Sequence, residues 1–253
     1  MTSKLLSTSS ATAENRELHR LAPRLDPAGF AQMVSARHEQ HVDPARSLCL
    51  ATVEVLRVSG AGLVLMSGRQ SLDFIGVSDG VSEEVEQLEY TLGEGPCVSA
   101  FRNKTPVFDA DLADEEQERW PAFRRVALEA GICAAFGFPL LIERICIGAL
   151  NLYHDKPGVL TDDQVADALV VAAFASRSVL AWQADAPPGA LAWQLERAPN
   201  HKVEIHQATG RISVQAGVSL EDALALLRAY AFSHDRPISD VAAEIASGHL
   251  RLD

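Results

Sequence analysis

An arginine and a phenylalanine four residues apart, Arg228 and Phe232, have types and spacing suited to binding chemistry. On a helix the two side chains share one face, because residues four apart are neighbours on a helix surface. Unpaired bases stack on aromatic rings and guanidinium planes, and cations hold the phosphates. The pair therefore predicts a nucleic-acid-binding surface, with Arg211 and Arg236 as further cations. The alternative is that Phe232 packs against another part of the chain and Arg228 is only solvated.

The cysteines and histidines offer weaker chemistry. The four cysteines lie far apart, and their spacing matches neither a tetrahedral zinc site nor a disulfide framework. Cys97 follows a polar helix, where a thiolate could be accessible, but no neighbouring cation would lower its pKa. We expect it to pack as a small residue, and whether it is redox-active stays open. Cys133 and Cys146 are expected in the core, and His38 and His41 form no metal set.

Catalytic and metal-binding patterns are weak. The acidic run Asp109 to Glu118 could hold a divalent cation, although a solvated acidic loop is more common. The sequence contains no G-x-S-x-G, H-E-x-x-H, Walker A or G-x-G-x-x-G motif. We therefore expect a protein that is not an enzyme, and the sequence indicates no cofactor and no metal.

Composition bounds the class of protein. The 253 residues are 47% hydrophobic and 22% charged, which is typical of one large globular domain or two small ones. The net charge of −12 argues against a nucleic-acid binder, but residues 197–253 sum to −1, so the acidity belongs to the rest. The apolar stretch Leu169 to Leu180 is too short to cross a bilayer, and the start lacks a secretion signal. We expect a cytoplasmic protein with no membrane partner.

The elements that position these residues fall into two groups. Up to about residue 183 the pattern alternates between strands and helices, with a Ser/Thr-rich start that should be mobile. The expected helices are 44–56, 82–92 with Ser82 as its cap, 97–101, 122–130, and a last one that Thr161 caps and that runs to Gln183. The expected strands are 63–66 and 72–77, which form a hairpin, then 106–108, 132–142 and 145–153. This order predicts an α+β domain.

A proline- and glycine-containing break at 184–190 separates the first group from three short helices. Their expected caps are Asn200, Ser219, and either Asp235 or Ser239, with Gly217 and Gly248 as stops. The first helix carries two apolar stripes, which we expect to serve the bundle core and either a partner helix or the rest of the same protein. The core stripe is Ile205, Ala208, Ile212 and Ala216, and the second is Val203, Gly210 and Val214.

Two families resemble these segments. Gly93-Glu94-Gly95-Pro96-Cys97, with Pro106-Val107 and the strands FGFPLLIE and CIGALNLY, resembles the GAF domain of actinobacterial regulators. The tail, with VEIHQATGRI, Leu227-Arg228 and Asp240-Val-Ala242, resembles the ANTAR domain of RNA-binding transcription antiterminators. The resemblance implies an antiparallel sheet flanked by helices, then a three-helix bundle. The expected divisions are a mobile segment and lead-in helix at 1–43, a GAF-like sensor at 44–184, a linker at 185–196 and an ANTAR domain at 197–253.

The ANTAR resemblance implies a dimer that binds paired hairpins in nascent mRNA and prevents a terminator from forming. The GAF resemblance implies a regulatory input that binds a small molecule or mediates dimerisation. Carried over to this chain, the RNA-binding residues are Lys202, Thr209, Gly210, Arg211, Arg228, Phe232 and Arg236. In the ANTAR family, the first helix commonly carries the motif Ala-Lys-Gly. This chain has Ala208-Thr209-Gly210 at that place, so it lacks one cation that could contact phosphate.

The resulting hypothesis is a homodimeric antitermination regulator whose GAF-like domain controls RNA binding. One alternative is a DNA-binding transcription factor, because the second and third helices could form a helix-turn-helix. The third helix, 240–245, carries no Arg, Lys, Asn or Gln to read bases, which disfavours DNA. The other alternative is a protein-interaction adaptor that has lost RNA binding.

Overall fold

The computed structural model describes residues 23–38, 43–67, 71–185, 201–234 and 236–252. The chain divides into two compact units, of which one contains residues 1–67 and 72–179 and the other contains 68–71 and 180–253. The start of the chain up to residue 22 and, except for Asp185, the expected linker lie outside the described residues.

A five-stranded sheet forms the middle of the first unit, in the order β2-β1-β5-β4-β3. The strands are β1 (Gly60–Ser67), β2 (Ser71–Val77), β3 (Val107–Asp109), β4 (Ala134–Ile142) and β5 (Ile145–His154). Strand β5 pairs antiparallel with both β1 and β4, and β3 pairs antiparallel with β4. The predicted antiparallel sheet is therefore confirmed, and its register places Gly62 opposite Asn151.

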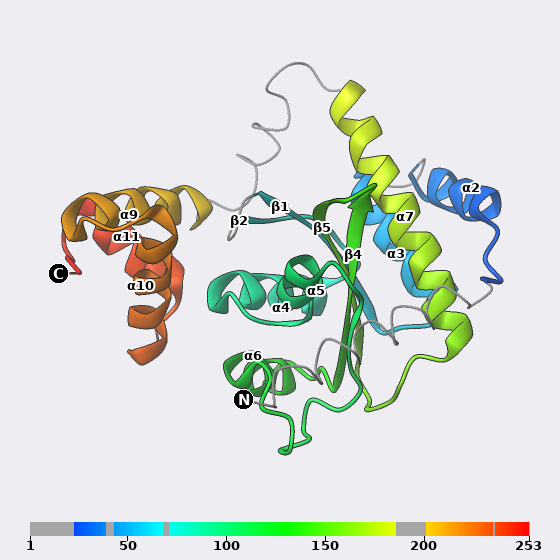
Figure 1. Ribbon diagram of the computed structural model, residues 1–253, viewed down its shortest axis with the longest axis horizontal. Helices are drawn as coiled ribbons and strands as arrows, with labels where there is room; N and C mark the ends of the chain where they lie inside the picture. The colour runs from blue at the N-terminus through cyan, green and yellow to red at the C-terminus, as the bar shows by residue number, and fades with distance from the viewer. Residues whose placement is uncertain (1–22, 39–42, 68–70, 186–200, 235, 253) are drawn as a thin grey trace, which may run out of the picture. The chain divides into compact units, whose positions relative to one another are not determined.

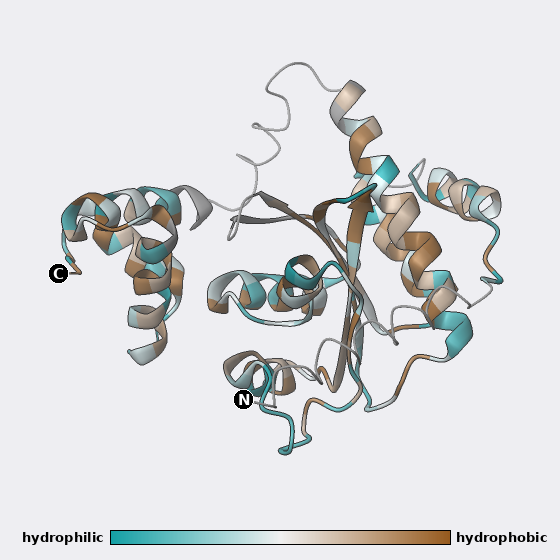
Figure 2. Cartoon of the chain, viewed as in Figure 1, coloured by the Kyte–Doolittle hydropathy of each residue, from teal (hydrophilic) through white to brown (hydrophobic). Residues whose placement is uncertain are grey.

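Helices cover both faces of this sheet (Figure 1). One face carries α2 (Pro27–His38), α3 (Pro44–Leu56) and α7 (Asp162–Asp185), and the other carries α4 (Gly80–Leu92), α5 (Pro96–Asn103) and α6 (Pro121–Glu129). Hydrophobic residues run along much of α7 and β4 (Figure 2). Phe30 of α2 and Phe174 of α7 meet edge to face with ring centroids 5.3 Å apart. The α+β class expected from the sequence is confirmed.

The caps of these helices include one correction. The cap of α4 is Asp79 rather than Ser82, since the Asp79 carboxylate accepts the Ser82 N–H at 3.0 Å and the helix begins at Gly80. The expected cap at Thr161 forms a capping box, in which Thr161 Oγ1 accepts the Gln164 N–H and Gln164 Oε1 accepts the Thr161 N–H.

The acidic segment Asp109 to Glu118 is not simply a solvated loop. Asp109 is buried, and its carboxylate pairs with Arg124 Nη1 at 2.5 Å. Arg124 Nη2 also donates to the backbone carbonyls of Asp111 and Asp114, each at 2.8 Å. A buried guanidinium from α6 therefore organises the first half of this segment, which sequence proximity alone does not reveal.

Two expectations about apolar residues need correction. Cys133 and Cys146 are only half-buried, whereas Cys49 and Cys97 are completely buried. Residues Asp162–Trp182 of α7 are long and apolar enough to span a membrane by length and composition, contrary to the shorter stretch expected. The core helices of globular domains pass the same test, and Ala168, Val171 and Ala175 of α7 are buried in the first unit.

Within its described residues from 201 onward, the second unit has the helices α9 (His201–Ala216), α10 (Leu220–Ser233) and α11 (Ile238–Ser247). Ser219 caps α10 by accepting the Asp222 N–H, as expected, but the cap position of α11 is Pro237, and Ser239 lies inside the helix. Asn200 and Asp235 lie outside the described residues. The buried apolar residues are Ile205, Ala208, Ile212, Ala223, Leu224, Leu227, Ala231, Ile238, Val241, Ala242 and Ile245.

The core stripe of α9 ends one turn earlier than expected, because Ala216 is exposed. The α10 face that carries Ala223, Leu224, Leu227 and Ala231 also predicts Tyr230 in the core, but Tyr230 is only half-buried, and its ring stacks on His234 with centroids 3.9 Å apart. The amphipathic pattern therefore locates the bundle core correctly and misjudges its edges.

Candidate functional site

The segment Gly93 to Cys97 joins three helices through its side chains and backbone. Glu94 Oε1 accepts the N–H groups of Ala122 and Phe123 at 2.8 and 3.0 Å, so Glu94 caps α6 from a distant part of the chain. Gly95 has a φ of 137°, and a Cβ there would lie 2.5 Å from Glu89 Oε1. The glycine is needed both for its backbone conformation and for this close approach.

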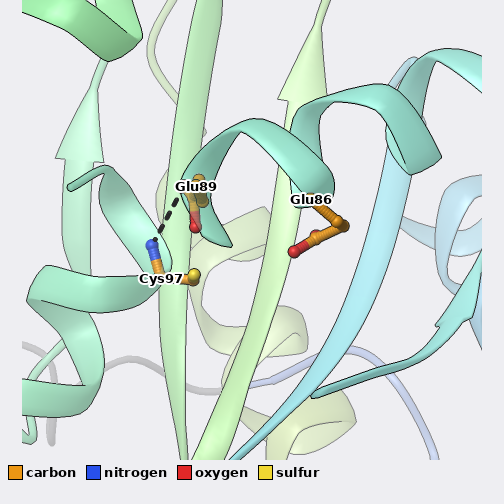
Figure 3. Close-up of side chains that lie close together, drawn as sticks. All are labelled: Glu86, Glu89 and Cys97. Carbon is orange, nitrogen blue, oxygen red and sulfur yellow. Dashed lines mark hydrogen bonds between the residues drawn. The ribbon is translucent and has the colours of Figure 1, made fainter. Parts of the chain in front are cut away.

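A buried cluster of titratable side chains lies beside this segment (Figure 3). Glu86 and Glu89 come from α4 and Cys97 comes from the start of α5, and one ligand atom of each lies within 4.8 Å of the others. The Cys97 N–H donates to Glu89 Oε1 at 3.3 Å, which is the dashed line in Figure 3. All three residues are at most 2% exposed.

Strand β5 supplies the polar partners of the two carboxylates. Asn151 Nδ2 donates to Glu86 Oε1 at 2.9 Å and to Glu89 Oε2 at 3.3 Å. Tyr153 Oη donates to Glu86 Oε1 at 2.9 Å. Residues 151 and 153 point to the same face of the sheet, because side chains alternate along a strand. The sheet therefore presents a neutral amide and a neutral hydroxyl to two acidic groups.

Burial dominates the electrostatics of the cluster. Desolvation raises the pKa of Glu86 to about 7, although the hydrogen bonds from Asn151 and Tyr153 act against it. Desolvation and the Glu86 charge raise the pKa of Glu89 well above its usual value. Desolvation, followed by the charges of Glu89 and Glu86, likewise raises the pKa of the Cys97 thiol. An exposed, reactive thiolate at Cys97 is therefore not what this environment favours.

In the second unit, the two α10 residues singled out from the sequence differ in exposure. The Phe232 side chain is 55% exposed, which is unusual for a large aromatic residue. Arg228, one turn before it, is half-buried. The structure thus places an aromatic ring at the surface of α10, and RNA binding by either residue stays a prediction.

Arg211 and Arg236 both contact the C-terminal half of α11. Arg211 Nη1 donates to the carbonyls of Ile245 and Ala246 at 2.8 and 2.5 Å, where the helix dipole favours a cation. Arg236 forms two hydrogen bonds with the Glu244 carboxylate, at 3.1 and 2.7 Å. Both guanidiniums therefore stabilise the bundle, which leaves fewer of their donors for phosphate.

The remaining expected residues lie on α9. Thr209 is 7% exposed, and its hydroxyl donates to the Ile205 carbonyl at 2.7 Å. The Thr209 hydroxyl hydrogen is therefore bonded within α9 rather than offered to a ligand. Gly210 is half-buried, and a Cβ built there would meet nothing within 4 Å. Lys202 lies in the first turn of α9, and its side chain is outside the described part.

The family model of the GAF domain matches residues 43–179, which is more than half of the chain. The chain belongs to the GAF domain family. The family model of the ANTAR domain matches residues 193–245, so a GAF domain precedes an ANTAR domain in this chain. Both are regulatory rather than catalytic domains.

Solved structures resemble the GAF domain of this chain. A domain of a putative two-component sensor histidine kinase from Sinorhizobium meliloti 1021 is 21% identical, with 56% of this chain and 91% of that chain covered and a TM-score of 0.46. The GAF domain of an Acinetobacter phosphoenolpyruvate-protein phosphotransferase is 14% identical, with 62% and 95% covered and a TM-score of 0.49. No curated protein matches this sequence.

The acidic members of the buried cluster were not predicted from the sequence. Glu86 and Glu89 are three residues apart in a helix that is rich in glutamate, a pattern typical of a solvated face. The sequence feature that could have indicated the cluster is the pair Asn151 and Tyr153, two polar residues that alternate within an otherwise apolar strand. Polar groups at buried strand positions require partners, and the opposite helix supplies them.

Proposed function

We propose that this chain is a cytoplasmic, signal-responsive transcription antitermination regulator. Its ANTAR domain, at residues 197–253, binds hairpin RNA in nascent transcripts, and its GAF domain, at 44–184, controls that binding. The ANTAR family match over residues 193–245 is the observation that carries the proposal. The exposed Phe232 supports it, because aromatic rings at a surface stack on the unpaired bases of hairpin loops.

The alternative of a DNA-binding factor has less support from α11. Val241, Ala242 and Ile245 of this helix are buried, and Glu244 is paired with Arg236. Asp240 is exposed, and a carboxylate at a DNA-facing surface repels phosphate. The described surface of this helix therefore offers little for reading the major groove.

We infer a homodimer from the second stripe of α9. Val214 is 84% exposed, and Gly210 on the same side has open space where a side chain would stand. A helix that exposes an apolar residue beside a glycine can be approached closely by a second helix. A signal bound by the GAF domain acts if it favours one arrangement of the dimer over another.

The experiment is a binding titration of the full chain against an RNA with two hairpins and against duplex DNA of matched length. We expect RNA binding that weakens as salt rises, because phosphate contacts release counterions. Tighter binding to the DNA would support a DNA-binding factor. Binding to neither would favour the adaptor, and either result would refute the proposal.

The variant Phe232→Ala tests the surface itself. Loss of one stacking platform should weaken RNA binding by about tenfold, since stacking on an aromatic ring is worth about 1–3 kcal/mol per base. Leu226→Ala is the matched control, because Leu226 is an exposed apolar residue on the same helix at 43%. Equal effects of the two variants on RNA affinity would remove Phe232 from the proposed surface.

A further inference from the structure

We propose that Glu86, Glu89 and Cys97 bind one divalent transition-metal cation of the Zn²⁺ class inside the GAF domain. The proposal concerns a site within the first unit and does not depend on RNA binding. It rests on the donor set, on two buried oxygen atoms that lack hydrogen bonds and on the charge of the cluster.

The donor atoms are of suitable types and already lie close together. One atom from each of the three side chains lies within 4.8 Å of the others. Tetrahedral Zn²⁺ binds carboxylate oxygen at about 2.0 Å and sulfur at about 2.3 Å, which places ligand atoms about 3.3–3.8 Å apart. Closing the cluster around an ion therefore requires movements of about 1 Å, which side-chain rotations can supply.

Two buried oxygen atoms point to a missing partner. Glu86 Oε2 and Asn151 Oδ1 have no hydrogen bond within the described part of the chain, and their residues are at most 2% exposed. Buried oxygens without hydrogen bonds are rare in native proteins, and a bound ion can satisfy them. When an ion binds, rotation of the Asn151 amide would turn Oδ1 toward it as a fourth ligand, in exchange for the two hydrogen bonds that Nδ2 donates to the carboxylates in the ion-free cluster.

The charge of the cluster requires compensation. The hydrogen bonds to the two carboxylates come from Asn151, Tyr153 and the Cys97 backbone, and none of these groups carries a positive charge. Two unpaired charges in a buried site are costly, so they must be offset by protons or by a cation. Cys97 binds the ion as a thiolate and releases its proton to solvent, so one divalent ion offsets two of the three donor charges and leaves a net charge of −1.

The packing around the cluster favours an ion over an organic molecule. A Cβ at Gly62 of β1 would overlap with Glu86 Oε1, so the backbone closes directly on the carboxylate. Gly95 closes on Glu89 in the same way. Because a sulfur donor joins the oxygen donors, the site suits Zn²⁺ better than Mg²⁺ or Ca²⁺, which prefer oxygen alone.

The test uses the full chain after treatment with a chelator. We expect Zn²⁺ to bind with a stoichiometry of one and to raise the melting temperature, because a ligand that binds the folded state stabilises it. Co²⁺ in the same site should give the near-ultraviolet charge-transfer absorption of a cobalt–thiolate bond. Failure of both ions to bind would show that protons neutralise the pair and would overturn the proposal.

Variants assign the site to these residues. Cys97→Ser should abolish the cobalt–thiolate absorption, and Glu89→Gln should weaken Zn²⁺ binding strongly. Cys133→Ser is the matched control, and it should change neither the absorption nor the Zn²⁺ affinity. Tyr153→Phe removes a hydrogen bond to a ligand and should weaken binding by about 10–100-fold. Circular dichroism checks that each variant folds. If a variant does not fold, the Zn²⁺ and Co²⁺ titrations of the wild-type chain still test the proposal. Absorption that persists in Cys97→Ser would overturn the assignment.

Discussion

Glycine sets the distance between the sheet and the acidic residues of α4. Gly62 lies opposite Asn151 in the register of β1 and β5, directly under the Glu86 carboxylate. A side chain at this position would occupy the place of Glu86 Oε1. The buried pair of carboxylates therefore depends on one residue without a Cβ in the adjacent strand.

We expect Gly62→Ala to lower the free energy of unfolding by about 1–3 kcal/mol, because the new methyl group must push buried atoms apart. Denaturant unfolding measures the change. Gly80→Ala is the control, since a Cβ at Gly80 meets nothing within 4 Å, and it should leave stability equal or slightly higher. Equal stability of Gly62→Ala and wild type would mean that Glu86 can move away freely.

The elements were largely predictable, whereas the contacts between them were not. Helical periodicity and strand alternation locate the elements of both domains because those signals are local. The cap of α4 was misplaced because Asp79 and Ser82 are both good capping residues three positions apart. Arg124, which organises the acidic segment, and Asn151, which contacts Glu86, are distant in sequence from their partners. Such contacts follow from tertiary packing.

The cap of α4 makes stability depend on pH in the acidic range. Partial burial raises the pKa of Asp79. Hydrogen bonds from the side chains of Ser78 and Ser82 and from the backbone of Ser82 and Val81 lower it by more, so the pKa of Asp79 lies below its usual value of 3.8. A lowered pKa means that the stabilisation is present above 3.8 and is lost as pH falls through the folded-state pKa. Asp79→Asn should therefore be less stable than wild type at neutral pH and equally stable in strong acid. A difference that does not change with pH would contradict this role.

Val214, the exposed residue of the second stripe of α9, predicts the effect of a charge on the proposed assembly. Val214→Asp should shift the protein from dimer to monomer in light scattering, because a buried unpaired carboxylate opposes helix pairing. Val159→Asp is the control, since Val159 is 77% exposed in the GAF domain and is not part of this stripe. A Val214→Asp protein that remains dimeric would place the dimer interface elsewhere.

The whole molecule separates charge between its two domains. The net charge is −12 for the chain but only −1 for residues 197–253, so an acidic GAF domain is joined to a nearly neutral ANTAR domain. Under the proposed function, we therefore expect RNA affinity to depend on a local surface and on the proposed pairing of two copies rather than on bulk attraction. The order of the two domains was readable from motifs, because the motifs lie within continuous segments. The buried cluster of the GAF domain was not, because its members come from two helices and their hydrogen-bond partners from a strand.

Transcription read-through tests the central proposal most directly. On a template whose terminator overlaps a two-hairpin segment, adding the protein should increase the fraction of full-length transcript. Phe232→Ala should lose most of this increase, and Leu226→Ala should retain it, since only the first removes the stacking surface. Read-through that stays unchanged at protein concentrations that saturate the hairpin RNA would contradict antitermination as the function of this protein.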